Sequence, residues 1–284
     1  MDALAALRLQ LEWGADEALV ETPVDRMAVA ARPVAAPAAT RARPAASAPS
    51  QLAAALRPPP HPAQTQALLP GAAPAPAARA QEIAAAARTL EELRAALERF
   101  DGCPLSATAT NLVFADGNPD SGLMLVGEGP GADEDRIGKP FVGASGQFLD
   151  RMLASIGLDR SGYVITNLIP WRPPGNRNPT DNEVLVCLPF LLRHIALVRP
   201  RRLVLLGALA TRAVTGSNTG IRRMRGRWLD VTIPDLPAPV PTLPMLHPAY
   251  LLRTPGAKRE AWNDMLLLKR TMDDDMIIRK ISES

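Results

Sequence analysis

The chain has 284 residues and a net charge of +3, a balance that permits nucleic-acid binding without requiring it. Two cysteines argue against a disulfide framework, and no run approaches the ~20 apolar residues of a membrane span. The first residues lack a basic leader before a long apolar run, so we expect no secretory signal, a cytoplasmic location and no membrane partner.

The N-terminal part of the chain differs in composition from the rest. Residues 1–20 are predicted to contain a short helix, because Leu4, Leu7 and Leu11 share one helical face. Residues 21–81 are predicted to be a disordered linker, since 20 alanines and 11 prolines among residues 31–80 leave little apolar bulk to offset ordering entropy. We therefore expect a globular domain over 82–273 and a C-terminal tail over 274–284.

The globular part alternates short apolar runs with helical patterns. Strands are predicted at 123–127, 163–169, 202–207 and 241–248, and helices at 89–100, 145–158, 180–200, 209–216 and 257–272. Thr89 with Glu92, and Thr180 with Glu183, have the spacing of capping boxes, while Pro189 should kink or interrupt its helix. The pattern favours an α/β fold with a central four-stranded parallel sheet and helices on both faces.

Three of the predicted strands end in polar segments: GEGPGADED (127–135), TNLIPWRPPGNRNP (166–179) and HPAYLLR (247–253). Ligands of open α/β sheets bind beyond the carboxyl ends of the strands, so we expect the site there. The first segment is not a P-loop, because no Gly-Lys-Ser/Thr follows, and Pro130 interrupts a dinucleotide fingerprint. Asp133, Glu134 and Asp135 would repel a phosphate, which leaves a metal-carboxylate cluster or a capped turn as alternatives.

Together, GEGPGADEDRIGKPFVGASGQFLDRML (127–153) and the other two polar segments resemble the uracil-DNA glycosylase superfamily, nearest to its iron–sulfur family 4. The resemblance covers about residues 100–272. It implies a monomeric enzyme that flips uracil out of DNA and hydrolyses its N-glycosidic bond, leaving an abasic site. The N-terminal region would then suit a repair or replication partner. A broader-range deaminated-base glycosylase, a non-catalytic DNA-binding module and a metal-dependent phosphohydrolase using residues 133–135 are the alternatives.

The resemblance also implies roles for individual pocket residues. Phe141 would stack on the flipped base, and Asn167 would pair with its edge and separate uracil from cytosine. His247 would donate to the departing uracil anion, while Glu128 and Glu134 would position water or stabilise the sugar cation. The expected substrate-binding residues are Gly127, Gly129, Phe141, Asn167 and Asn176. Gly129 replaces the aspartate of the best-known branch, which leaves room for bulkier bases.

DNA contacts are expected around this pocket. Ser145 and Gly146 open a helix whose amides suit a phosphate. The segment GIRRMRGRW (220–228) would add a basic strip of Arg222, Arg223, Arg225 and Arg227. By resemblance, Leu251, together with Leu252, would enter the base stack as a wedge, and Arg253 would hold the backbone.

A cofactor is the point where the sequence departs from family 4. That family holds a four-iron cluster with four cysteines, of which Cys103 and Cys187 remain here. Phe100 and Trp171 stand at the other two positions, and neither side chain is a thiolate ligand. We therefore expect no iron–sulfur cluster, no metal and no other cofactor, with aromatic rings filling the volume of the cluster.

Overall fold

The computed structural model describes residues 76–282, with side chains described up to Asp275. The predicted helix over 1–20 and most of the predicted linker lie outside these residues. Helix α2 (Pro76–Ala86) starts inside the range predicted as linker and buries Ala80 and Ala84 in the core beside α6. Alanine has the highest helix propensity, so composition alone does not separate an alanine-rich helix from an alanine-rich linker.

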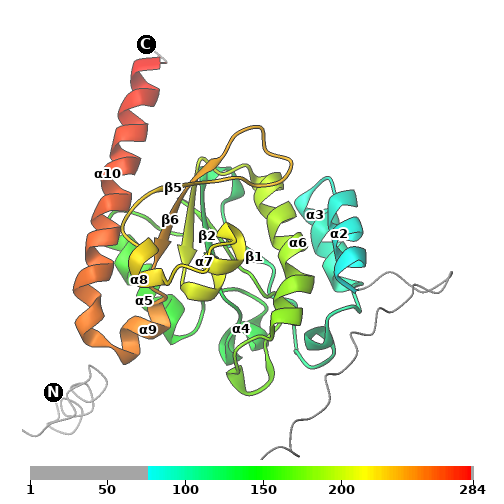
Figure 1. Cartoon of the computed structure of the whole chain (residues 1–284). Helices are drawn as coiled ribbons and strands as arrows, with labels where there is room; N and C mark the ends of the chain where they lie inside the picture. Colours follow the sequence, from blue (N-terminus) through cyan, green and yellow to red (C-terminus); the bar gives the residue numbers. More distant parts are fainter. Residues whose placement is uncertain (1–75, 283–284) are drawn as a thin grey trace, which may run out of the picture. The chain divides into compact units, whose positions relative to one another are not determined.

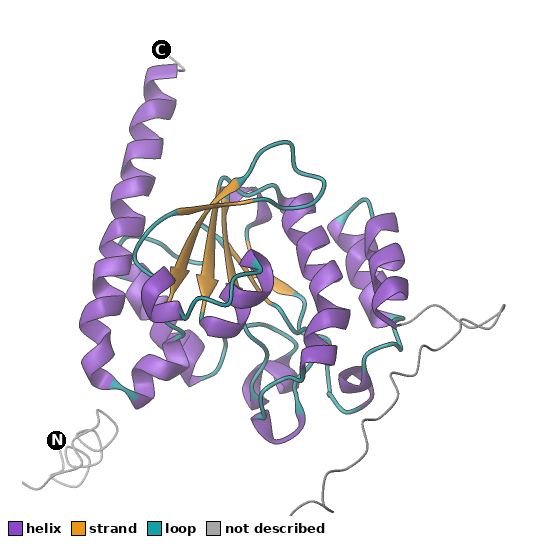
Figure 2. Cartoon of the chain, viewed as in Figure 1, coloured by secondary structure: helices purple, strands orange, loops and turns teal. Residues whose placement is uncertain are grey.

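A six-stranded sheet with the order β1-β3-β2-β4-β6-β5 runs through the described domain. Helices flank its strands in Figures 1 and 2. Its strands are β1 (Ala115–Gly117), β2 (Leu123–Gly127), β3 (Val164–Asn167), β4 (Arg202–Leu206), β5 (Leu229–Val231) and β6 (Val240–Met245). The four inner strands are parallel, which confirms the predicted α/β fold and its central sheet. The antiparallel edge strands β1 and β5 were missed, because three residues are too short for a periodic pattern.

Helices surround this sheet. Beside α2 they are α3 (Leu90–Glu98), α4 (Ala132–Ile137), α5 (Ala144–Ala154), α6 (Asp181–Val198), α7 (Ala208–Thr215), α8 (Ile221–Met224), α9 (Pro248–Arg253) and α10 (Lys258–Ser282). Single 3₁₀ turns occupy Pro104–Ala107, Pro119–Ser121, Pro174–Asn176 and Pro255–Ala257. Helix α10 continues to Ser282, so most of the range expected as a tail is helical. None of the described helices has the length and apolarity needed to cross a membrane.

The two helix starts predicted from capping-box spacing are capped by their threonine side chains. At α6 the box is complete: Glu183 N donates to Thr180 Oγ1 at 3.2 Å, and Thr180 N donates to Glu183 Oε2 at 2.7 Å. At α3 the Thr89 hydroxyl accepts from Glu92 N at 3.2 Å, but the carboxylate of Glu92 accepts from the preceding amide, that of Arg88. Pro189 lies inside α6, and the helix continues past it to Val198.

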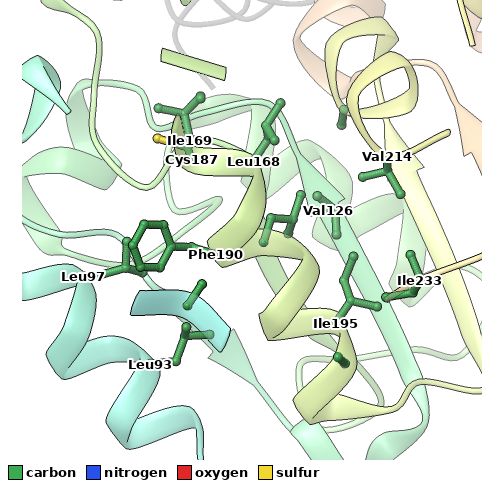
Figure 3. Packing of buried hydrophobic residues seen from close by; sticks show 14 of the residues in the cluster. Leu93, Leu97, Val126, Leu168, Ile169, Cys187, Phe190, Ile195, Val214 and Ile233 are labelled. Carbon is green, nitrogen blue, oxygen red and sulfur yellow. The ribbon is translucent and has the colours of Figure 1, made fainter. Parts of the chain in front are cut away.

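The two faces of the sheet bury two apolar clusters, because successive strand residues point to opposite sides. Met124 and Val126 pack with the cluster under α2, α3, α6 and α7, of which Figure 3 shows part. Leu123 and Leu125 pack on the other face, with side chains of α5 and α10. Figure 1 shows α6 and α10 on opposite sides of the strands. This double cover explains why the inner strands are apolar without interruption.

The strand register brings the three polar segments to one edge. Gly127, the last residue of β2, lies opposite Asn167, the last residue of β3. At the end of β4, Gly207 N donates to Met245 O at 2.9 Å, which sets the chain entering His247 beside the chain entering α7. The segments that follow β2, β3 and β6 therefore meet at the carboxyl edge of the sheet, as predicted.

Candidate active site

A cavity of about 280 Å³ opens at this edge. The predicted residues that line it are Glu128, Gly129, Glu134, Phe141, Ser145, Asn167, Asn176, His247 and Arg253. It is also lined by residues to which no role was assigned: Pro130, Gly131, Pro173, Arg177, Asn178, Pro179 and Ala249. All of these residues belong to the three polar segments. Membership of a segment therefore indicated that they line the cavity, whereas their residue types alone did not.

Phe141 lies in the cavity wall with an unusual backbone. Its φ of 56° is left-handed, which costs a residue with a side chain about 1–2 kcal/mol. The ring is buried, and its centroid lies 5.9 Å from that of His247, with the planes tilted by 30°. A Cβ on Gly127 would collide with the Phe141 ring and with Asn167 Oδ1. Gly127 therefore makes room beneath the cavity for two lining residues and does not line it.

Asn167 ends β3 and is 5% exposed. Its Oδ1 is buried and has no hydrogen-bond partner among the described residues. An unpartnered buried polar atom costs about 1–3 kcal/mol, so folded proteins rarely retain one without a use. In the wall of the cavity, this amide can recognise the edge of a flat polar ring.

His247 is the N-cap of α9, and its ring is held by one hydrogen bond. Ala249 N donates to His247 Nδ1 at 3.1 Å, so we assign the ring proton to Nε2. Burial, together with the nearby cation of Arg253, lowers the pKa of His247 to about 4. Near neutral pH the imidazole is therefore uncharged, and Nε2–H is its only donor.

Glu128 follows β2 and caps the start of α7, a contact that the sequence did not indicate. Its Oε1 accepts from Leu209 N at 2.9 Å. Burial raises the pKa of Glu128, and the backbone donors of α7 and the Arg253 cation partly offset this effect. Gly207, at φ 102°, leaves the necessary space, because a Cβ there would collide with Glu128 Oε1.

Glu134 also lines the cavity, but both of its carboxylate oxygens are used within the fold. Oε2 accepts from Gly131 N at 3.1 Å, and Oε1 accepts from Val142 N at 2.9 Å and from Gly143 N at 2.8 Å. The carboxylate therefore ties the start of α4 to the loop that follows Phe141. The structure leaves it less free than Glu128 to act on water.

The two acids beside Glu134 point elsewhere. Asp135 is buried and accepts from Thr110 N at 2.8 Å, Thr110 Oγ1 at 2.9 Å and Asn111 N at 3.2 Å. Asp133 forms an ion pair with Arg136 at 3.2 Å on the surface. Within the described part of the chain, no group of three or more His, Cys, Asp and Glu side chains is arranged to hold a metal ion. Glu134 and Asp135 thus accept hydrogen bonds from backbone amides, as the capped-turn alternative expects.

Asn176 and Arg177 belong to the loop between β3 and α6. Asn176 has a left-handed φ of 56°, and its Oδ1 accepts from Arg172 Nε at 2.7 Å. Arg177 donates to both oxygens of Glu183, at 2.6 and 2.9 Å. These bonds lower the pKa of Glu183 to about 2. The ion pair fastens the cavity loop to the first turn of α6.

The residues expected to contact DNA occupy different environments. Ser145 lines the cavity, but Gly146 is buried against the Phe141 carbonyl, where a Cβ would collide. Close packing against the Phe141 backbone therefore explains why residue 146 is a glycine. Leu251 is 1% exposed and belongs to a small core cluster, whereas Leu252 is 42% exposed. Of the two leucines, only Leu252 is accessible to a DNA stack.

The basic strip is divided in the same way. Arg225 is 15% exposed and donates to Asp264 Oδ1 at 2.7 Å and Oδ2 at 2.9 Å. Arg222 donates to the Tyr250 hydroxyl at 3.0 Å and lies 3.4 Å from a Glu260 oxygen. The side chains of Arg223 and Arg227 are exposed. Arg225 therefore ties this segment to α10, whereas Arg223 and Arg227 remain exposed.

The four positions that match cluster ligands lie together in the core. Cys103 and Cys187 are buried, with their Sγ atoms 3.9 Å apart. Phe100 and Trp171 belong to the same apolar cluster, and the ring of Phe100 packs edge-on against Phe190 at 5.0 Å. The positions thus supply two adjacent thiols within the apolar core.

The model of the Uracil DNA glycosylase superfamily matches residues 114–266, and the chain belongs to this superfamily. Within it, the chain is similar to type-4 uracil-DNA glycosylases from three organisms. It is 36% identical to that of Pyrobaculum aerophilum over 183 residues, covering 63% of this chain and 92% of the relative. The figures are 39% over 158 residues for Thermotoga maritima (55% and 80%) and 40% over 166 residues for Archaeoglobus fulgidus (57% and 82%).

These relatives contradict the expectation that the chain has no iron–sulfur cluster. All three are type-4 enzymes, the group to which the sequence resemblance attaches such a cluster. The expectation rested on two missing thiolates, but iron–sulfur centres also accept other ligands, such as histidine. Cys103 and Cys187 are the two residues here that fit iron, while Phe100 and Trp171 do not.

Proposed function

We propose that this chain hydrolyses the N-glycosidic bond of uracil in DNA, releasing uracil and leaving an abasic site for repair. The observation that carries the proposal is the buried, unpartnered Asn167 Oδ1 in a cavity that also holds the Phe141 ring and an uncharged His247. A reader of base edges, an aromatic platform and a neutral donor are what the excision of a flipped base requires. Membership of the superfamily supports the same reaction.

Asn167 would select uracil through its side-chain amide. Uracil presents an N–H donor beside a carbonyl acceptor, and the amide offers an acceptor and a donor in the matching order. Cytosine has a ring-nitrogen acceptor and an amino donor at these positions, so both contacts would be reversed. A buried amide facing the wrong edge stays unpaired, which costs far more than a lost surface contact.

Phe141 and His247 would then act on the bound base. The Phe141 ring supplies a face on which uracil stacks after leaving the duplex. As the bond between N1 and C1′ breaks, its electron pair moves onto the uracil ring and its carbonyl oxygens. Nε2–H of His247 stabilises this anion by a hydrogen bond, which a neutral imidazole provides without transferring its proton.

The sugar becomes an oxocarbenium-like cation, which a carboxylate on its other side stabilises. Glu128 fills this role in the proposal, because one of its oxygens is anchored at α7 and the carboxylate borders the cavity. A water adds to C1′, and Glu128 accepts its proton. Glu134 positions the backbone of the cavity wall in this proposal, since its oxygens already accept three backbone donors.

The DNA duplex would be held around the cavity. Leu252 is the wedge in this proposal, with Arg253 and Ser145 at the cavity rim and Arg223 and Arg227 meeting phosphates. Uracil-containing DNA is the partner. A monomeric state, a cytoplasmic location and a repair or replication partner for the N-terminal region stay predictions.

The test compares three oligonucleotides that differ only in one base: uracil, cytosine or thymine. Wild-type protein is expected to release base from the uracil substrate alone, measured as free uracil by chromatography. His247→Gln should reduce the rate by about 10²–10³, the usual loss for an anion-stabilising donor. No uracil release by folded wild-type protein would overturn the proposal.

One observation favours a wider substrate range as a second candidate. A Cβ on Gly129 would meet only Ile169, at 3.6 Å from its Cβ, so the cavity wall is open there. Release of hypoxanthine from an inosine-containing oligonucleotide would support this range. Gly129→Ala should then reduce hypoxanthine release more than uracil release.

A further inference from the structure

We propose that Arg160 is a positioning residue of the glycosylase site, which holds the Phe141 platform in its left-handed backbone conformation. This inference rests on the proposed function, because it assigns Phe141 to base stacking. Arg160 lies in the connection between α5 and β3 and is not among the residues that line the cavity. Any effect it has on the reaction must therefore pass through the residues it contacts.

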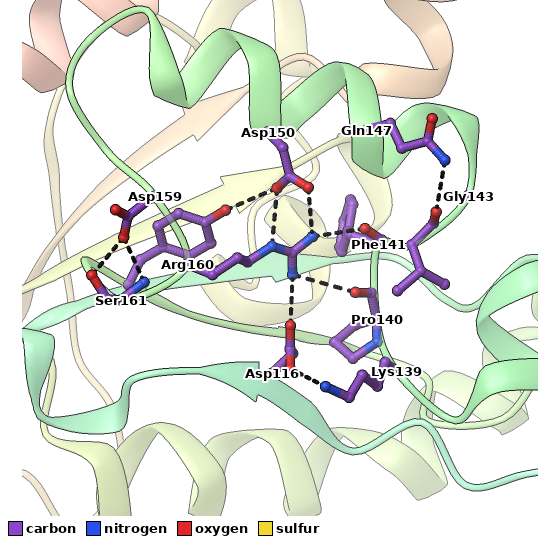
Figure 4. A network of polar contacts seen from close by, with 12 residues as sticks. Asp116, Lys139, Pro140, Phe141, Gly143, Gln147, Asp150, Asp159, Arg160 and Ser161 are labelled. Carbon is purple, nitrogen blue, oxygen red and sulfur yellow. Dashed lines mark hydrogen bonds and ion pairs between the residues drawn. The ribbon is translucent and has the colours of Figure 1, made fainter.

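The contacts of Arg160 end on the platform backbone. Nη2 donates to Phe141 O at 2.7 Å, and Nη1 donates to Pro140 O at 3.4 Å (Figure 4). Phe141 is the residue whose φ is 56°, so both carbonyls flank a conformation that the chain resists. Two donors from one rigid guanidinium fix the direction of both carbonyls at once.

Acidic side chains of α5 and β1, and the aromatic ring just before β3, hold the guanidinium. Asp150, on α5, accepts from Nε at 3.0 Å and from Nη2 at 3.2 Å, and Asp116, on β1, lies 3.4 Å from Nη1. The Tyr163 hydroxyl donates to Asp150 at 3.0 Å, and its ring centroid lies 5.8 Å from the guanidinium carbon. Lys139 pairs with Asp116 at 3.2 Å. The clamp is thus anchored to the sheet and to α5.

Packing of α5 against the same carbonyl completes the clamp. Gly146, in the first turn of α5, touches the Phe141 carbonyl so closely that a Cβ would collide. Gln147 Nε2 donates to Val142 O at 3.2 Å, just beyond the platform. The backbone of Phe141 is therefore gripped by α5 and by Arg160, while its ring remains in the cavity. This arrangement aligns the ring before a base arrives, so the base need not order it.

The test is a double-mutant cycle with Arg160→Gln and Phe141→Ala on a uracil-containing oligonucleotide. Arg160→Gln should lower kcat/KM by about 10- to 100-fold, the loss expected for charge-assisted bonds to an aligning group. In the Phe141→Ala background, Arg160→Gln should lower it less than about threefold, because the platform it positions is gone. Arg151→Gln, an exposed arginine on α5, is the matched control and should leave kcat/KM unchanged.

Binding separates positioning from general support of the fold. Arg160→Gln should weaken binding of DNA with a 2′-fluoro-deoxyuridine, which resists cleavage, by about the factor lost in kcat/KM. It should leave binding of abasic DNA within about twofold, since that ligand has no base to stack. Equal weakening for both ligands, or an equal loss in the Phe141→Ala background, would overturn the proposal.

A milder variant covers the case in which Arg160→Gln does not fold. Asp116→Asn removes one support of the clamp and should lower kcat/KM by a smaller factor, again only when Phe141 is present. A loss that is independent of Phe141 would contradict the proposal. Failure of the proposed function would look different, because wild-type protein would then release no uracil at all.

Discussion

Two regions carry conspicuous polar side chains in the sequence: the sheet edge around Asn167 and the arginine segment 220–228. Folding uses the polar groups of these two regions differently. At the sheet edge, Asn167 Oδ1 is buried without a partner among the described residues. In the arginine segment, Arg225 donates to both oxygens of buried Asp264. A polar atom that folding leaves without a hydrogen-bond partner can bind a ligand, whereas an atom that already has partners in the fold stabilises the structure.

The same contrast occurs within one loop. Glu128 and Glu134 have the same side chain and were assigned the same roles from the sequence. Glu134 accepts three backbone donors, whereas Glu128 is anchored at the α7 start and has a pKa raised by burial. The two carboxylates therefore differ in how many lone pairs folding leaves free, although both line the cavity.

The largest effect is expected at Asn167. Asn167→Asp replaces the amide donor with an acceptor, so we expect uracil release to fall about 10³-fold, as for a lost pairing to a buried polar group. Asn118→Asp, in a cap at the other end of β2, is the matched control and should keep full activity. The measurement is single-turnover release of uracil. Similar rates for both variants would contradict the assignment of Asn167 to uracil recognition.

Arg225→Ala should act on the fold and Arg223→Ala on DNA. Removing Arg225 leaves Asp264 buried and unpaired, so the free energy of unfolding should fall by about 3 kcal/mol. Arg223 is exposed, and its replacement should leave stability unchanged and reduce DNA affinity a few-fold, with a shallower salt dependence. Chemical denaturation and DNA binding at two salt concentrations measure both. Equal stability of the two variants would contradict this division.

Glu128 should control the acid limb of the pH–rate profile. Because burial raises its pKa, the carboxyl group gains its proton at a pH above its ordinary 4.5 as the solution is acidified. The proposed role needs the ionised carboxylate. As the solution is acidified, the rate should therefore begin to fall at a pH above 4.5. Glu128→Gln should lower the rate about 10–100-fold and remove this limb. An unchanged limb in the variant would assign the titration to another group.

Glu134→Gln should have the smallest effect on the chemical step. The substituted amide loses acceptor capacity for one of three backbone donors, so we expect about 1–2 kcal/mol of lost stability. Uracil release at a temperature where the variant is folded should fall less than in Glu128→Gln. Thermal denaturation and single-turnover rates provide the comparison, and a larger kinetic loss at Glu134 would reverse the two roles.

Much of this arrangement was predictable, because strong local patterns produce it. Uninterrupted apolar runs indicated the four inner strands, and the polar segments after them indicated the position of the cavity. The contacts that divide the roles are not local. Arg225 meets Asp264 from 39 residues away, and Leu251 is buried only because α9 packs on its neighbours. No residue pattern in a single segment records such partners.

The cofactor prediction failed for a related reason. Phe100 and Trp171 were treated as excluding a cluster because each position was judged by its own residue type. The relatives, which share 36–40% identity, contradict that exclusion. Cys103 and Cys187 lie 3.9 Å apart although they are 84 residues apart in sequence. Which side chains can reach a cluster together therefore depends on the folded core, and the residue type at each separate position does not show it.

The most direct test of the proposed reaction counts both products of one turnover. Wild-type protein is mixed in EDTA with an oligonucleotide containing a single uracil, and free uracil and alkali-labile abasic sites are quantified in the same sample. The predicted result is equal amounts of the two products, with an intact strand before alkali. Strand breaks without free uracil, or neither product, would contradict the assignment of the cavity to base excision.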